Sequence, residues 1–153
     1  MNRTLRQLSQ SIVTGVSVVL CSVAAGAQET DRTEDMRGLG NCQGCVFEGH
    51  DFSGQRLMGI DLGESKLSDI HFDRAGLGIA IFDGAKLASI SFDGADLRGA
   101  SFVGARLVDV TFENADLRGA VFEGAFLERT DLQSALLCTT QMPDDEMDNS
   151  DCR

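Results

Sequence analysis

A period of five residues in the apolar side chains constrains the fold of this chain more than any other feature. Every fifth residue from Phe47 to Leu137 is Leu or Phe, which makes nineteen consecutive matches. A small residue, most often Ala, stands two positions before most of them, and Gly stands two positions after nine of them. Residues 95–99 and 115–119 carry the fullest copies, Ala-Asp-Leu-Arg-Gly. The segment 45–139 is therefore a tandem repeat.

This period fits neither a regular helix nor a straight strand. Five steps along an α-helix advance by about 140°, which spreads large side chains around the axis, and odd steps along a strand alternate between its faces. Either element would expose half of the Leu and Phe side chains. All of them can point inward if each five-residue unit forms one short side of a coil, with Ala also inward and Gly at the corner. We therefore expect the chain to wind as a solenoid.

A sampling interval of twenty residues shows how many sides each coil has. Two of the four resulting rows are rich in Phe and two are rich in Leu, and the β-branched residues Ile70, Ile90 and Val110 also lie twenty residues apart. A four-sided coil would place Phe on two opposite walls and Leu on the other two. We predict an all-β fold in which equivalent residues of successive coils stack.

The repeat resembles the pentapeptide-repeat family, whose fold is a right-handed quadrilateral β-helix. The resemblance covers residues 45–139, and these 95 residues would form about 4.75 coils of 20 residues. It extends to the flanks, where Cys42-Gln43-Gly44-Cys45 precedes the repeats and Cys138 and Cys152 follow them, as in exported members. The resemblance implies the fold but no single activity, because members of the family share the solenoid and differ in role.

The first 27 residues are typical of a secretory signal peptide. Arg3 and Arg6 precede an apolar run over residues 12–25, and Ala25-Gly26-Ala27 is a small-residue cleavage site. The run is shorter than the roughly 20 residues of a membrane-spanning helix. We expect export to the periplasm or the extracellular space without a stable membrane anchor. Residues 28–41 would form a flexible acidic leader, residues 42–139 the β-helix with its cysteine cap, and residues 140–153 an irregular tail.

The charge balance argues against a nucleic-acid ligand. The chain has 13 Lys and Arg against 24 Asp and Glu, a net charge of −11, and cleavage before Gln28 would remove two arginines and leave −13. Proteins that bind phosphate backbones by bulk attraction need the opposite sign. Because the sequence also carries no nucleophile-base constellation, phosphate loop or dense metal-ligand cluster, we predict no enzymatic activity, no cofactor and no metal.

The four cysteines beyond the signal peptide are expected to cap the two ends of the solenoid. Cys45 and Cys138 would lie about 20 Å apart along the stack, whereas a disulfide needs Cα atoms within about 7 Å. This distance favours the pairs Cys42–Cys45 and Cys138–Cys152. The alternative for Cys42-Gln43-Gly44-Cys45 is a redox-active dithiol, although the thioredoxin-like βαβ context is missing. The two histidines, His50 at an inward and His71 at an outward position, are expected to be structural or solvated.

The outward positions form columns of charge with a twenty-residue spacing. Lys66, Lys86 and Arg106 would stack on one wall and Asp73, Asp93 and Glu113 on the next, which suits a solvated, soluble surface. A third wall would carry a ladder of ion pairs, Asp96 with Arg98 and Asp116 with Arg118. Apolar outward residues cluster toward the C-terminal end and are a candidate interface with a homodimer mate or another protein: Val103, Val108, Val121, Phe126 and Leu136.

Three function hypotheses follow. The leading one is an exported structural scaffold or protein-interaction module of the cell envelope, with an unidentified protein partner. The first alternative comes from the family resemblance, since some members imitate DNA and bind topoisomerases; the acidic charge favours it, and the signal peptide opposes it. The second alternative is an exported dithiol redox protein, which rests on the Cys42–Cys45 pair alone.

Overall fold

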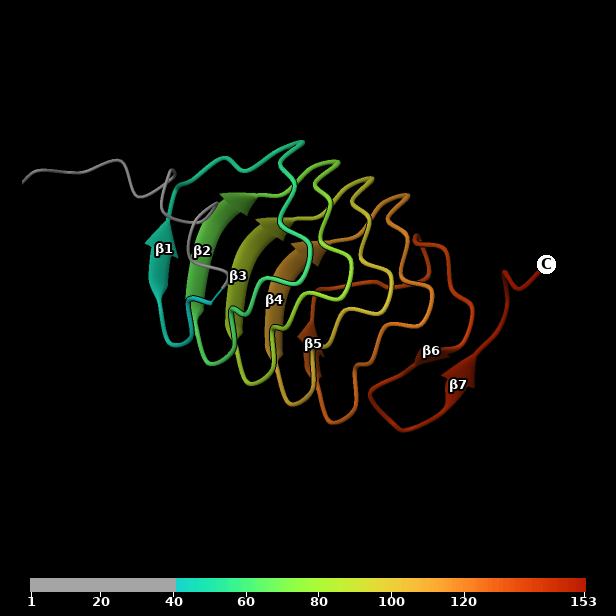
Figure 1. Cartoon of the computed structure of the whole chain (residues 1–153). Coiled ribbons are helices and arrows are strands. Elements are labelled where there is room, and N and C mark those ends of the chain that lie inside the picture. Colours follow the sequence, from blue (N-terminus) through green and yellow to red (C-terminus); the bar gives the residue numbers. More distant parts are fainter. Residues whose placement is uncertain (1–40) are drawn as a thin grey trace, which may run out of the picture. The chain divides into compact units, whose positions relative to one another are not determined.

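The chain winds into a stack of parallel coils, seen in a computed structural model that describes residues 41–153 (Figure 1). One sheet of five parallel strands runs along the stack in chain order. Its strands are β1 (Val46–Glu48), β2 (Lys66–His71), β3 (Lys86–Ser91), β4 (Arg106–Thr111) and β5 (Phe126–Glu128). Each strand pairs with the next at an offset of twenty residues, so that Leu67 lies beside Leu87 and Ile70 beside Ile90. The twenty-residue coil predicted from the sequence is confirmed.

The other sides of the coil keep the same register without forming long strands. Isolated parallel bridges join Asp61 to Ile81, Ile81 to Ser101, and Asp96 to Asp116. Backbone N–H groups donate to carbonyl oxygens of the following coil, as from Leu77 to Asp96 at 2.8 Å. The predicted quadrilateral β-helix is therefore present, and successive coils are hydrogen-bonded on every side.

The four walls are named here by their central inward residues. The first wall contains the beginning of each strand from β1 to β5, and it is centred on Phe47, Leu67, Leu87, Leu107 and Leu127. The second wall is centred on Phe52, Phe72, Phe92, Phe112 and Leu132. The third wall is centred on Leu57, Leu77, Leu97, Leu117 and Leu137. The fourth wall is centred on Leu62, Phe82, Phe102, Phe122 and Met142.

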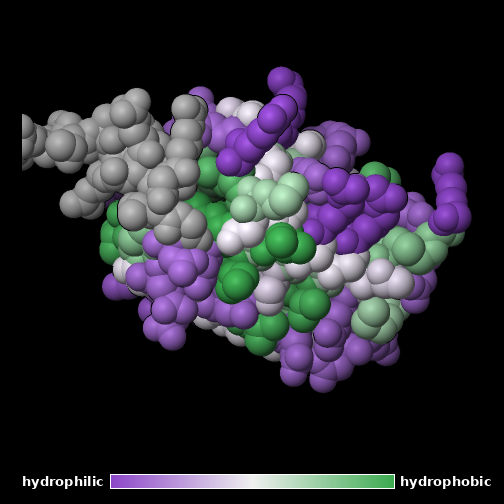
Figure 2. Space-filling view, viewed as in Figure 1, coloured by the Kyte–Doolittle hydropathy of each residue, from purple (hydrophilic) through white to green (hydrophobic). Residues whose placement is uncertain are grey.

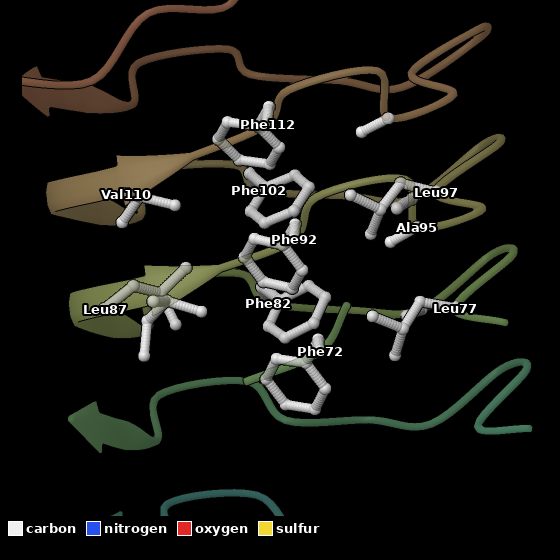
Figure 3. Close-up of a cluster of buried hydrophobic side chains, with 14 of the residues drawn as sticks. Phe72, Leu77, Phe82, Leu87, Phe92, Ala95, Leu97, Phe102, Val110 and Phe112 are labelled. Atoms are coloured by element: carbon white, nitrogen blue, oxygen red, sulfur yellow. The ribbon is translucent and has the colours of Figure 1, made fainter. Parts of the chain in front are cut away.

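The core is a double ladder of phenylalanine rings flanked by leucines (Figure 3). Rings on the same wall stack, with centroids 5.2 Å apart between Phe72 and Phe92 and 4.8 Å apart between Phe82 and Phe102. Rings from opposite walls meet edge to face, as Phe82 and Phe92 do at 5.6 Å and 78°. Both geometries are favourable for aromatic quadrupoles. The central ladder and the inward Ala, Ile and Val residues are almost all buried, as the five-residue period requires.

The corners of the coil require the left-handed backbone region. Gly99 turns the corner between the third and fourth walls with a φ of 67°, and Ile79 turns the equivalent corner one coil earlier with a φ of 54°. Glycine adopts this conformation without steric cost, whereas a β-branched residue is strained there. The glycine in the repeat therefore has a backbone role, and the coil geometry is maintained even where glycine is replaced.

The C-terminal segment is more regular than the sequence predicts. Residues 140–143 continue the fourth wall, since Gln141 pairs with Val121 and Met142 packs against the core. The chain then turns back, and β6 (Thr140–Gln141) pairs antiparallel with β7 (Met147–Asp148). The expected irregular tail is thus partly a further coil side and a short hairpin, because hydrogen bonds to the last complete coil extend the solenoid. The expected signal peptide and all but the last residue of the expected leader lie outside the described residues.

Candidate functional site

The N-terminal end of the solenoid is closed by a small disulfide loop. Cys42 and Cys45 are bonded, with Cα atoms 5.5 Å apart, and the Cys45 N–H donates to the Cys42 carbonyl at 3.2 Å. Ser65 occupies a fully buried inward position where most coils have Ala, and its hydroxyl donates to the same Cys42 carbonyl at 2.9 Å. The buried hydroxyl thus holds the disulfide loop against the first complete coil.

The C-terminal end is closed in a similar way by the second disulfide. Cys138 and Cys152 are bonded, with Cα atoms 4.8 Å apart. Asp151 and Leu137 exchange two hydrogen bonds: the Asp151 N–H donates to the Leu137 carbonyl, and the Leu137 N–H donates to Asp151 Oδ2. The buried Thr140 hydroxyl donates to the Leu117 carbonyl at 2.9 Å. The final residues therefore add hydrogen-bond partners along the edge of the last coil.

The two disulfides join the cysteine pairs that the distance argument favoured, and each disulfide lies within its own end of the stack. Each lies next to a buried hydroxyl, and Ser65 and Thr140 are the buried polar residues within 41–153. The period does not predict a role for these two positions, because they belong to inward columns that most other coils fill with Ala. Ser65 and Thr140 have a role because the fold places each hydroxyl next to a cysteine.

The first wall carries the expected column of cations on its outer face. Lys66, Lys86 and Arg106 are aligned by the strand register, one coil apart. Phe126 continues this column, is 51% exposed, and lies with its ring centroid 4.6 Å from the Arg106 guanidinium carbon. Arg106 also pairs with Glu128 at 3.2 Å. The one Phe outside the core is thus a neighbour of a cation, an arrangement with favourable cation–π geometry.

The second wall carries the expected acidic column, and its carboxylates join successive coils. Asp73 accepts a hydrogen bond from the Ser91 hydroxyl, and Asp93 accepts one from the Thr111 hydroxyl at 2.7 Å. Asp93 also accepts a hydrogen bond from the Glu113 N–H at 3.1 Å. A shallow groove of about 430 Å³ runs along this column, between the carboxylates and the residues of the next corner.

The third wall carries the predicted ladder of ion pairs. Arg98 contacts Asp96 at 2.6 Å and Asp116 at 3.7 Å, and Arg118 contacts Asp116 at 2.5 Å. Side-chain hydrogen bonds from Arg98 and Arg118 hold the pKa values of Asp96 and Asp116, respectively, below the usual range. The same contacts raise the pKa of each arginine. The ladder is therefore ionised at neutral pH.

The five residues of the predicted apolar interface lie on three different walls. Val108 and Phe126 belong to the first wall, Val103 and Val121 to the fourth, and Leu136 to the third. Phe126 and Leu136 are exposed, and the three valines are half-buried. The solenoid thus does not bring all five together in one flat face.

Three exposed apolar residues at one corner of the coil were missed by the sequence reasoning, as was the exposed Val46 on the first wall. Met58 is 73% exposed, Ile79 is 61% exposed, and Ile81 stands in the same column as Val121. They lie at the corner between the third and fourth walls. The signal that could have found them is Ile79 itself, which occupies a repeat position that is Gly one coil before and one coil after. Figure 2 shows a face on which apolar side chains gather between charged ones.

The two histidines make local contacts. The His50 ring is stacked on Phe52 with centroids 5.8 Å apart, and its Nδ1 lies 2.7 Å from the Glu48 carbonyl, so it extends the aromatic ladder at its N-terminal end. His71 is exposed, with its Nδ1 3.8 Å from Asp73. Within residues 41–153, no group of three or more His, Cys, Asp or Glu is arranged to hold a metal ion. The same residues include no helix long and apolar enough to cross a membrane.

Comparison with known proteins agrees with this geometry. The family described as pentapeptide repeats matches residues 80–119 and 112–137, with eight copies of the repeat. No curated protein matches the sequence. Among solved structures, the chain is similar to HetL, a pentapeptide repeat protein involved in heterocyst differentiation regulation in the cyanobacterium Nostoc sp. strain PCC 7120. That similarity has a TM-score of 0.66 and 34% identity over 71% of this chain and 51% of HetL.

A second solved structure is similar over most of its own length. It is a pentapeptide repeat protein from the thylakoid lumen of Arabidopsis thaliana, with a TM-score of 0.53 and 32% identity over 69% of this chain and 70% of that one. The chain spans about half of the HetL chain, so the activity of whole HetL does not transfer with the fold. The uninterrupted five-residue period, the four-walled coil and these similarities together establish that the chain belongs to the pentapeptide-repeat family.

Proposed function

We propose that this protein is exported and acts in the cell envelope or outside the cell as a non-catalytic scaffold that binds another protein. The observation that carries the proposal is the pair of disulfides, one at each end of the solenoid. Disulfides persist in oxidising compartments and are rare in the cytosol. The signal-peptide features of residues 1–27 support the same location. The similar Arabidopsis protein likewise comes from a lumenal compartment.

The outer surface supports binding of a macromolecule. The groove on the second wall is open and lined largely by charged residues. Small-molecule sites are usually concave and mostly apolar. Exposed apolar side chains such as Ile79, Ile81 and Phe126 are instead typical anchors for a protein partner.

DNA mimicry by the acidic surface is the weaker proposal. The second wall presents a column of carboxylates, which favours it. The first wall, however, presents the cations Lys66, Lys86 and Arg106, and the arginines of the third wall neutralise its aspartates. A surface that imitates a phosphate backbone should be negative on every side that a topoisomerase contacts. Addition of the purified protein to a DNA supercoiling assay is expected to leave the reaction unchanged.

Intact-mass measurement of the full-length protein, expressed in its own host and recovered by cell fractionation, tests the proposal. We expect an envelope or secreted species that begins at Gln28 and carries two disulfides, so that alkylation modifies Cys42, Cys45, Cys138 and Cys152 only after reduction. An uncleaved cytosolic species with free thiols would overturn the proposed location and favour the DNA-mimic alternative. If Cys42–Cys45 is recovered reduced while Cys138–Cys152 stays oxidised, the redox alternative is supported instead.

A further inference from the structure

The backbone edge of the third wall is open at the N-terminal end of the solenoid. In later coils the N–H groups of this wall donate to carbonyl oxygens of the next coil, as from Leu77 to Asp96 at 2.8 Å. Within residues 41–153, the Arg56 N–H group and the carbonyl oxygens of Arg56 and Met58 form no hydrogen bond. Unpaired backbone groups along such an edge favour the addition of another extended segment.

At the C-terminal end, the edge of the same wall is covered by the last residues of the chain. Leu137 and Asp151 exchange two hydrogen bonds, and the Thr139 N–H donates to Asn149 Oδ1 at 3.0 Å. The chain therefore uses its own terminal segment to complete the third wall at one end of the stack.

The N-terminal disulfide loop covers a different wall. Asn41 pairs with Asp61 on the fourth wall, and the Cys42 N–H donates to the Asp61 carbonyl at 2.6 Å. Since each coil runs from the third wall to the fourth, the residues that precede Asn41 have the shortest route to the open third-wall edge.

We propose that residues 35–40 pair along this edge and add one further side to the third wall. The register of the later coils assigns the partners. The Arg37 N–H would donate to the Arg56 carbonyl, and the Leu39 N–H to the Met58 carbonyl, as Leu77 does one coil later. The Arg56 N–H would donate to the Asp35 carbonyl. The three backbone groups that are open within residues 41–153 would all be paired.

The side chains of this segment suit the end of a stack. Its inward positions carry Asp35 and Arg37, where complete coils have a small residue and Leu. Terminal repeats need a polar outer face, because one side of their layer meets water. The aliphatic part of Arg37 can cover Leu57 while its guanidinium reaches solvent. The five-residue apolar period ends before this side of the coil for the same reason.

The corner position of the segment is apolar. Leu39 belongs to the corner column of Gly59 and Ile79, beside the exposed side chains of Met58 and Ile79. Placed there, Leu39 would add an apolar neighbour to this exposed group.

The covalent connection at Asn41 favours the chain's own segment over any other occupant. A tethered segment competes at a high effective concentration, whereas a second copy or another protein has to bind from solution. The inference goes beyond the proposed function and does not depend on it, since the segment is present whether or not the chain is cleaved before Gln28.

Amide hydrogen exchange, followed by NMR on the full chain, tests the register residue by residue. The amides of Arg37, Leu39 and Arg56 are expected to exchange at least about tenfold more slowly than unprotected amides. The amides of Met36 and Gly38 have no partner in this register and should exchange without protection, so they are the controls within the same molecule.

Two proline substitutions provide a matched pair. Leu39→Pro removes a donor and cannot adopt the positive φ of the corner, so the Arg56 amide should exchange about tenfold faster than in wild type. Gly38→Pro should leave that rate unchanged. Its position is the second residue of a turn that, one coil pair later, is closed by a hydrogen bond from Ala80 to Leu77 and has a positive φ at Ile79. This type II pattern accepts proline. Retained protection of the β3 and β4 amides verifies that each variant is folded.

Unprotected Arg37, Leu39 and Arg56 amides in the wild-type protein overturn the proposal, because the edge is then open. An Arg56 amide that is protected in wild type and stays protected in Leu39→Pro also overturns it, since another segment then covers the edge. Protection that rises with protein concentration would identify that segment as part of a second copy.

Discussion

At the scale of single residues, the corners of the coil show how backbone geometry overrides local preference. The stacking of successive coils places a left-handed residue at every corner from residue 44 to residue 139 except Ser134, and the chain supplies it with glycine at some positions and with Glu64, Asp69 or Asn114 at others. Acidic and amide side chains tolerate this region better than β-branched ones. Ile79 and Thr139 are the β-branched corner residues within 41–153, and Ile79 gains little burial in return for its strain.

Ile79→Gly is therefore expected to stabilise the fold. Relief of the left-handed strain should raise the free energy of unfolding by about 1 kcal/mol, because the exposed side chain makes few contacts to lose. Chemical denaturation of dilute protein, below the range of any self-association, measures this change. The reverse substitution at the neighbouring coil, Gly99→Ile, is the matched control and should lower the free energy of unfolding. If both substitutions lower the free energy of unfolding equally, the contacts of the Ile79 side chain outweigh its backbone strain.

At the scale of elements, side-chain hydrogen bonds and ion pairs on the outer walls join successive coils. Hydroxyl-to-carboxylate hydrogen bonds link the coils of the second wall, from Ser91 to Asp73 and from Thr111 to Asp93. Ion pairs link those of the third wall through Arg98. Both kinds of contact lie at the surface, so each supplements the buried ladder of Phe and Leu and does not replace it.

Acid is expected to remove the contribution of the third-wall ion pairs. The pKa values of Asp96 and Asp116 are lower in the folded chain than in an unfolded one, chiefly because of hydrogen bonds from Arg98 and Arg118. Their stabilising effect is therefore complete above the unfolded pKa of about 4, and is lost as the pH falls through the lowered folded pKa values.

The double variant Asp96→Asn, Asp116→Asn measures this contribution. We expect it to be less stable than wild type at pH 7 by about 1 kcal/mol or less per pair, since the pairs are partly exposed. The difference should shrink as the pH falls through the lowered folded pKa values of the two aspartates. Denaturation curves at several pH values provide the comparison, and a difference that persists unchanged in acid would mean that the lost packing, not the charge, is responsible.

At the scale of the whole molecule, the solenoid depends on its two ends. A stack of coils leaves unpaired backbone groups at each end, and terminal caps protect repeat proteins from edge-to-edge association. Here each cap combines a disulfide with a buried hydroxyl, Ser65 beside Cys42 and Thr140 beside Cys138. The second cap also recruits Asp151 to the edge of the last coil.

Removal of the second disulfide should destabilise the protein more than removal of the first. In the chain-entropy account a loop of about 15 residues contributes about 3 kcal/mol and a loop of four about 2 kcal/mol. Two double variants separate the caps in denaturation experiments. One carries Cys138→Ser and Cys152→Ser, and the other carries Cys42→Ser and Cys45→Ser. Hydrogen exchange at the Leu137 and Thr139 amides should accelerate only in the variant that lacks Cys138 and Cys152. Acceleration in both variants would contradict the independence of the two caps.

Much of the fold could be predicted because the repeat encodes it at every coil. The spacing of Leu, Phe and Ala specifies which side chains point inward, and the twenty-residue register then aligns every outward column, including Lys66 with Lys86 and the Asp96–Arg98 pair. These relations follow from the period alone, since one coil predicts the next.

The tertiary structure decided what the period does not encode. The continuation of the fourth wall by Met142, the hydroxyl caps of Ser65 and Thr140, and the grouping of Met58 with Ile79 each depend on a residue that departs from the repeat. The sequence by itself determined the walls and their core because burial of the large side chains leaves one solution to a five-residue period. Only the folded coils decided which hydroxyls and carboxylates complete the ends and which exposed residues share a surface, because those contacts join positions that no repeat relates.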